Sequence, residues 1–275
     1  MNKPNLLACG ALLAAGLSAP AFAQSGGEWS GPYVGGRIGY GFQPSDKNET
    51  ILFDTDLDGD FDDQVTTAAG ANAFSPGFCG GAAAGTGPGG GCDDDEDGIE
   101  WAVHAGVDGQ FGNLVIGGVV DYGRADIEDS VSAFSTTPAS YTITRRLTDH
   151  ASARLRAGVA MGSTLFYGTG GVAWGKIRNR FATSNTVNTF ANSGNDDAWG
   201  YKVGGGVEQR LGTGFSLGVQ YLYTSLKDED FRVRAAGPAP ATNPFIRTNA
   251  NGTDFARSGD RFTNHSVALT ASLRF

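Results

Sequence analysis

An acidic segment in the first third of the chain has the spacing of a calcium-binding loop. The carboxylates at the first, third, fifth and ninth positions of such a loop are Asp54, Asp56, Asp58 and Asp62. Gly59 at the sixth position can turn the chain sharply, so that alternate carboxylates converge on one hard cation. The twelfth position, normally a glutamate, is Val65. We therefore expect either a weak Ca²⁺ site or a solvated acidic loop that stays open.

The start of the chain is typical of an exported protein. Lys3 precedes a short apolar run from Leu6 to Leu17, and Ala21-Phe22-Ala23 forms an A-x-A cleavage site. We assign residues 1–23 to a cleaved signal peptide and residues 24–275 to a single folded domain.

Two cysteines, Cys79 and Cys92, remain after removal of the signal peptide. In an oxidising compartment a disulfide is the expected state of such a pair. The bond would close a loop of about 14 residues and would stabilise the fold by up to about 3 kcal/mol. Because the enclosed segment is rich in glycine, we interpret the bond as structural and not as a redox site.

His150 and Ser152 would lie on the same face of a strand, as a lipid-A acyl hydrolase would require. A nucleophile and a base also need a third group that orients the base, and the sequence identifies no such carboxylate. If residues 150–161 form a strand of a membrane barrel, its alternation points both side chains into the barrel and away from lipid. We therefore expect no enzymatic activity, and a lipid-A-modifying enzyme is a remote alternative.

Strands with strict alternation must position these residues. Eight runs of apolar and polar residues in period two are bounded by turn residues, at 31–42, 99–111, 114–124, 150–161, 164–177, 198–211, 215–226 and 264–275. Their length matches the roughly 9–11 residues of a transmembrane strand. Aromatic residues near the run ends fit the interface of a membrane.

The connections between the runs alternate between short and long. Those after the second, fourth and sixth runs are two to three residues, whereas those after the odd runs are long, at about 43–98, 125–149, 178–197 and 227–263. This pattern predicts an all-β fold: an eight-stranded antiparallel up-and-down transmembrane β-barrel with short periplasmic turns, four long extracellular loops and both termini in the periplasm. A soluble sandwich or lipocalin-type barrel would show the same alternation, with its apolar face inward.

Charged residues on the polar faces of the runs would point into this barrel. They are Arg37, His104, Asp108, Asp121, Arg154, Arg156, Lys202, Glu208, Arg210 and Arg274. An eight-stranded barrel has an interior just wide enough for side chains to fill. We expect these charges to pair and plug the lumen; a narrow ion path is the alternative.

The formal net charge of −9 argues against a nucleic-acid partner, which requires a basic surface. Charged residues make up only 18% of the chain and glycine is abundant, with 43 residues. Both values fit short, tightly turning strands better than helices.

Several strand segments resemble a known family. They are Trp29–Gly41 (WSGPYVGGRIGYG), Arg156–Ala160 (RAGVA), Leu165–Gly175 (LFYGTGGVAWG), Trp199–Glu208 (WGYKVGGGVE) and Gln220–Thr224 (QYLYT). The chain is similar to the small outer-membrane β-barrels of Gram-negative bacteria that are labelled porin family or OmpA-like transmembrane barrels. The resemblance implies an integral outer-membrane protein, often an abundant surface antigen. It also implies that the run ending at Phe275 is the signal recognised by the barrel-assembly machinery.

We therefore expect a structural or surface-interaction role: surface antigen, envelope integrity, and binding of an unidentified extracellular partner through the loops. The surrounding partners would be outer-membrane lipid and lipopolysaccharide. A diffusion pore for ions or small solutes is the alternative function. No cofactor is expected apart from the Ca²⁺ considered above.

Overall fold

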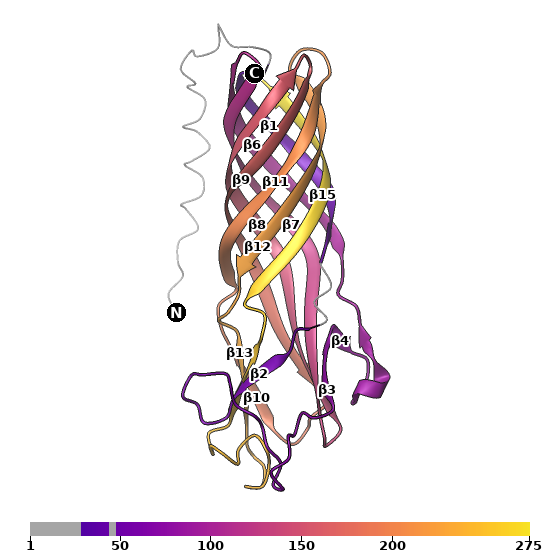
Figure 1. Ribbon diagram of the computed structural model, residues 1–275, viewed down its shortest axis with the longest axis vertical. Helices are drawn as coiled ribbons and strands as arrows, with labels where there is room; N and C mark the ends of the chain where they lie inside the picture. Colours follow the sequence, from indigo (N-terminus) through magenta and orange to yellow (C-terminus); the bar gives the residue numbers. More distant parts are fainter. Residues whose placement is uncertain (1–28, 44–47) are drawn as a thin grey trace, which may run out of the picture.

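The computed structural model describes residues 29–43 and 48–275, so the predicted signal peptide lies outside the described residues. Eight long strands form a closed ring (Figure 1). They are β1 (Gly31–Phe42), β6 (Gly98–Phe111), β7 (Leu114–Ser135), β8 (Ala139–Met161), β9 (Thr164–Thr183), β11 (Asp197–Arg210), β12 (Phe215–Lys227) and β15 (Arg261–Arg274). All neighbours are antiparallel, which confirms the predicted eight-stranded barrel.

The first and last strands close the ring. Their register runs from Tyr33 opposite Arg274 to Phe42 opposite His265. This pairing leaves no open edge in the sheet, and a strand in hydrocarbon needs a partner for every backbone N–H and C=O group.

The two faces of the ring differ sharply in chemistry. Leu155 is 76% exposed on the outside of β8, while its neighbours Arg154 and Arg156 are 4% and 5% exposed inside it. Ile38 and Leu269 are likewise exposed on the outer face. An apolar outside and a charged inside are the reverse of a soluble barrel, so this arrangement requires lipid around the ring.

The structure corrects the predicted second loop at 125–149. β7 continues to Ser135 and β8 begins at Ala139, so only three residues connect them. The register shifts once, between Arg124 and Ile127, and pairing then continues. The strands extend because Ile127, Val131 and other inward residues of this hairpin are buried beyond the ring.

The other long connections are also folded rather than open. They supply a four-stranded sheet in the order β10 (Thr189–Ser193), β13 (Arg232–Ala236), β14 (Thr253–Arg257) and β2 (Ile51–Asp54). Together with the tip of the β7–β8 hairpin, this sheet surrounds an aromatic core formed by Phe53, Phe74, Tyr141, Phe245 and Phe255. We call this part of the molecule, opposite the short turns, the cap (Figure 1).

A further piece of the first connection lies beside the barrel. β3 (Gly77–Gly80) pairs with β7, and β4 (Ala82–Ala83) pairs with β5 (Cys92–Asp93), with a 3-10 turn η1 (Pro88–Gly90) between them. Cys79 and Cys92 form the predicted disulfide, with their Cα atoms 6.5 Å apart. We call residues 79–96 the disulfide hairpin; η1 juts out to the side of the cap (Figure 1).

Across the part of the chain that the structure describes, no helix combines the length and apolar character needed to cross a membrane.

The outward apolar face makes a direct prediction for Leu155. Replacing Leu155 by Arg places a cation near the middle of the hydrocarbon layer and should cost about 2–4 kcal/mol, lowering the yield and stability of refolding into phospholipid bilayers. Met161→Arg is the matched control, because Met161 ends the same strand near the interface, where the cost falls to about 0–1 kcal/mol. Equal stability of the two variants would contradict a lipid-facing β8.

Candidate functional site in the lumen and the cap

The end of the lumen beside the short turns is closed by apolar side chains. Trp29 is fully buried there and packs with Val115, Ala160 and Leu165, and Tyr167 lies against them. The indole N–H of Trp29 donates to the carbonyl oxygen of Gly162 at 3.4 Å. Trp29, two residues before β1, thus covers this end of the barrel.

The first layer of charges lies next to this apolar floor. Arg156 Nη2 is 2.7 Å from Glu208 Oε2, and Arg274 Nη2 is 3.0 Å from Asp108 Oδ2. The two pairs are cross-linked, since Arg156 is 3.6 Å from Asp108 and Arg274 is 3.7 Å from Glu208. Arg156 also lies over the ring of Tyr167 at 4.2 Å. Two cations and two anions therefore neutralise one another across the full width of the lumen.

The second layer of charges is centred on Asp121. Its carboxylate is 2.9 Å from Arg154, 3.6 Å from Arg37 and 3.8 Å from Lys202. Arg37 also pairs with Glu100, which is 3% exposed. The sequence analysis did not identify Glu100 as a lumen residue, although it shares the inward parity of His104 and Asp108.

Very little free space remains between these two layers. A cavity of about 20 Å³ is lined by residues of both layers, including Arg37, Arg154, Arg156 and Glu208. That volume holds about one water molecule. The charged side chains of the two layers are therefore packed closely around this cavity.

Of the charges predicted to face the lumen, most belong to these two layers. The structure buries Arg37, Asp108, Asp121, Arg154, Arg156, Lys202, Glu208 and Arg274. His104 is half-buried, with its Nε2 2.9 Å from Ser272 Oγ. Arg210 is half-buried at the end of β11, outside the buried set.

His150 and Ser152 point into the second charged layer. Ser152 donates its hydroxyl proton to Asp121, and His150 Nδ1 lies 3.7 Å from Asp121 and 3.3 Å from Lys202 Nζ. A carboxylate is thus present, which the sequence did not reveal. It accepts the serine hydroxyl directly, so the imidazole is not placed to act as a base, and both side chains are buried away from lipid.

On the cap side of the second charged layer lie an apolar layer and then a buried ion cluster. The apolar layer contains Ala125, Ile127, Leu147, Ala173, Ile177, Ala198, Leu226 and Phe262. On the cap side of this layer, Asp129 and Arg145 of the β7–β8 hairpin contact two residues of the cap. These are Glu49, just before β2, and Arg257, at the end of β14. We call these four residues the clamp.

The clamp is almost fully enclosed. Arg257 pairs with Glu49 and lies 2.5 Å from Asp129, while Arg145 lies 2.5 Å from Asp129 and 3.6 Å from Glu49. The side chains are 3% to 6% exposed. Burial alone would raise the pKa of Asp129, but Arg257 and Arg145 hold it below its usual range. The clamp therefore ties two segments that are distant in sequence, around Glu49 and Arg257, to the β7–β8 hairpin of the barrel.

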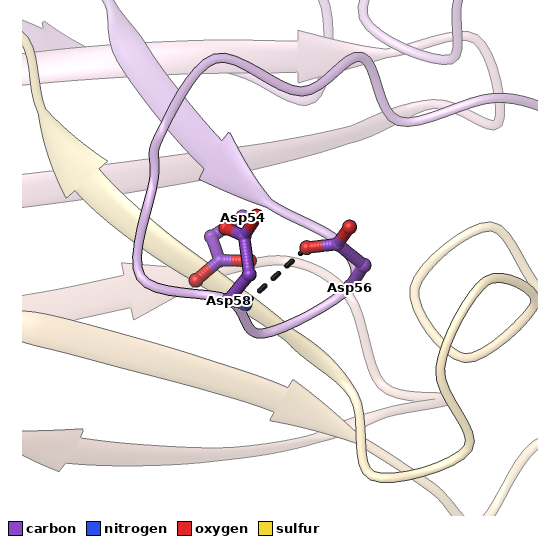
Figure 2. Close-up of side chains that lie close together, drawn as sticks. All are labelled: Asp54, Asp56 and Asp58. Atoms are coloured by element: carbon purple, nitrogen blue, oxygen red, sulfur yellow. Dashed lines mark hydrogen bonds between the residues drawn. The ribbon is translucent and has the colours of Figure 1, made fainter.

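The acidic segment of the predicted calcium loop is partly built as expected. Ligand oxygens of Asp54, Asp56 and Asp58 lie within 4.8 Å of one another (Figure 2). Asp54 is buried and accepts the N–H groups of Leu57 at 2.6 Å and Gly59 at 3.0 Å. The turn needs positive φ at Leu57 (66°) and Gly59 (99°).

Asp62, the fourth predicted ligand, is exposed and is not part of this group. Asp63 beside it accepts the backbone and side-chain donors of Thr55, at 2.7 and 2.8 Å. Partial desolvation, and then the charge of Asp58, raise the pKa of Asp56. A divalent cation would relieve this mutual repulsion, so three carboxylates remain candidate ligands.

Comparisons with known proteins agree with this architecture. The family model described as "Outer membrane protein beta-barrel domain" matches residues 9–275. The 31 kDa outer-membrane immunogenic protein of Brucella melitensis is 25% identical over 199 residues, covering 72% of this chain and 71% of that protein.

Among solved structures, the outer membrane protein OprG of Pseudomonas aeruginosa matches with a TM-score of 0.50 and 12% identity, over 90% of this chain and 99% of OprG. Ail, the attachment invasion locus protein of Yersinia pestis, matches with a TM-score of 0.33 and 9% identity, over 89% and 99% of the two chains. The likeness to OprG concerns the fold alone.

The clamp predicts a large effect of Arg257→Gln. Removing one buried cation leaves Glu49 and Asp129 short of a partner, which should destabilise the cap by about 3–5 kcal/mol. Hydrogen exchange should rise in residues 48–54 and 253–260 while the barrel strands stay protected. Arg234→Gln is the control: its pair with Asp254 is partly exposed and should contribute less than about 1 kcal/mol. Unchanged exchange in Arg257→Gln would show that the clamp does not hold the cap.

The acidic loop predicts a response to calcium. Millimolar Ca²⁺ should slow hydrogen exchange in residues 54–60, because an ion would fix the three carboxylates. The double variant Asp56→Asn/Asp58→Asn keeps Asp54 and its turn and should lose the response. Identical exchange with and without Ca²⁺ in the unmodified protein would leave only a solvated acidic loop.

Proposed function

We propose that this protein has a structural role and a role in surface interaction. The chain belongs to the outer membrane protein beta-barrel domain family and is an integral protein of the bacterial outer membrane. The barrel would anchor the cap, and the cap would present a folded surface outside the cell. Contact with lipopolysaccharide and with an extracellular partner would take place there.

The observation that carries this proposal is the series of buried side-chain layers inside the barrel. From the short turns toward the cap, the axis of the ring is occupied by an apolar layer, two charged layers, a second apolar layer and the clamp. A protein that conducted solutes would have to break several buried ion pairs at once, and losing one partner of such a pair costs about 3–5 kcal/mol. The lumen therefore supports anchorage better than transport.

The folded cap supports a surface role. Its aromatic core is sealed, with Phe255 and Val233 fully buried, and its rings pack closely, as with Phe53 and Phe74 at 4.5 Å. A defined surface can bind a partner with less loss of conformational entropy than an open loop. The Brucella relative is named for its immunogenicity, which agrees with an accessible cap in this chain as well.

The alternative functions have weaker support. A pore would need a continuous water path, and the space found between the charged layers is about 20 Å³. A lipid-A-modifying enzyme would need a nucleophile on the lipid side, whereas Ser152 is 7% exposed and hydrogen-bonded to Asp121 within the lumen.

The proposal requires the cap to face the outside and both termini to face the periplasm. Two single-cysteine substitutions test this orientation: Ala241→Cys in the cap and Thr213→Cys in a short turn, both at exposed positions. Cys79 and Cys92 are joined to each other, and Cys9 lies in the predicted signal peptide, so the predicted mature chain leaves no competing thiol. A membrane-impermeant maleimide should label Ala241→Cys on intact cells and Thr213→Cys only after lysis. The reverse pattern would overturn the proposed orientation.

A further inference from the structure

A groove runs between the disulfide hairpin and the outer face of the barrel wall. Its volume is about 440 Å³. One wall is basic and contains Arg146, Arg178 and Arg180 of β8 and β9. The other wall is acidic and belongs to the hairpin, with Asp93, Asp94, Asp95 and Glu96.

Two guanidinium groups of the basic wall lack a carboxylate partner among the residues that the structure describes. Arg146 is paired, at 2.6 Å from Asp126 and 3.3 Å from Glu128. Within residues 29–43 and 48–275, no carboxylate lies at ion-pair distance from Arg178 or Arg180, and both are exposed. In the strand register Arg178 lies directly opposite Arg146, so three cations share one side of the wall. Such a cluster is complementary to an anion with several acceptor oxygens.

The position of these cations relates them to the membrane surface. Arg178 and Arg180 share the outward parity of Val172 and Trp174 on β9, where Val172 faces lipid. Arg178 is four residues beyond Trp174 on β9. At about 3.4 Å per residue and a strand tilt of about 40°, its Cα atom lies about 10 Å closer to the cap, along the barrel axis, than that of Trp174. The basic wall therefore continues the lipid-facing surface into the headgroup layer.

The hairpin holds the acidic wall in place. Gly81 N donates to Ser130 O at 2.6 Å, and Ser130 N donates to Asp95 Oδ1 at 2.8 Å. Ser132 Oγ donates to Gly81 O at 2.9 Å, and the disulfide closes the hairpin. Burial raises the pKa of Asp95 to about 6. Asp93 and Asp94 remain exposed along the groove, where carboxylates can accept hydrogen bonds from hydroxyl groups.

We propose that this groove binds the phosphorylated sugar headgroup of a lipid in the outer leaflet of the surrounding membrane. Arg178 and Arg180 hold the phosphate, with Arg146 beside them, and Asp93 and Asp94 accept hydrogen bonds from sugar hydroxyls. The acyl chains then lie along the apolar face of β8 and β9. This inference rests on the proposed function in one respect, namely that the cap side of the barrel faces outward.

The test uses the full-length refolded protein in detergent and purified lipopolysaccharide as the probe. The double variant Arg178→Gln/Arg180→Gln should weaken binding by at least about tenfold, since two charge-assisted contacts are lost. Lys227→Gln is the matched control: Lys227 is also exposed, at the cap end of β12, but is paired with Glu229 at 2.6 Å and is absent from the groove. This control should bind like the unmodified protein.

Three outcomes would overturn the proposal. The double variant could bind lipopolysaccharide as tightly as the unmodified protein does. Lipopolysaccharide treated with phosphatase could bind as tightly as the untreated form, which would exclude the phosphate contact. Inorganic pyrophosphate could compete as strongly as the whole headgroup, which would make the groove a site for free anions. Labelling of Ala241→Cys on intact cells reports separately on the orientation, so failure of lipid binding and failure of the proposed function are distinguishable.

Discussion

The hydrogen bonds of the backbone impose the constraint on which the rest of this structure depends. In hydrocarbon, an N–H or C=O group without a partner costs several kcal/mol, so the sheet must close on itself. The pairing of β1 with β15 supplies the last set of partners. Closure then fixes which side chains meet lipid, because alternate residues of each strand face opposite ways. Leu155 is exposed and Arg154 and Arg156 are buried for that reason.

The charged interior follows from closure and creates a second constraint. A ring of eight strands is narrow, and a buried charge without a partner is strongly unfavourable. The chain meets both conditions with the two ion-paired layers around Glu208 and Asp121. The same solution recurs at the rim, where the clamp joins the cap to the barrel. For this reason we propose that binding takes place at the cap and at the outer face of the wall.

The alternation of the strands was sufficient to predict the barrel and most of the charged residues that line it, although it missed Glu100 and included Arg210. It was not sufficient for the cap, because the lengths of the connections predict only long extracellular loops and not the strands within them. The inward side chains of β7 continue with the same parity through Ile127, Asp129, Val131 and Ala133. The pairing of β7 with β8, however, shifts in register after Arg124. The clamp was missed for the same reason. Its members are more than 200 residues apart in the case of Glu49 and Arg257, and no local pattern links them.

The candidate sites show the same division. The spacing of the acidic loop brought Asp54, Asp56 and Asp58 together, since a short turn is decided locally. It could not place Asp62, because the neighbouring Phe61 contacts Arg232 and Asp63 accepts hydrogen bonds from Thr55. The sequence also could not predict that Arg178 and Arg180 lack a carboxylate partner in the described part of the chain. This depends on where the disulfide hairpin lies relative to β9, which is a property of the tertiary fold.

The central claim is that the lumen is sealed, and planar-bilayer recording of the refolded protein tests it most directly. The account predicts no discrete current steps, with or without millimolar Ca²⁺, because the charged layers leave space for about one water molecule between them. Reproducible single-channel steps would contradict the sealed lumen and would make Arg154 and Arg156 the first residues to examine for ion selectivity.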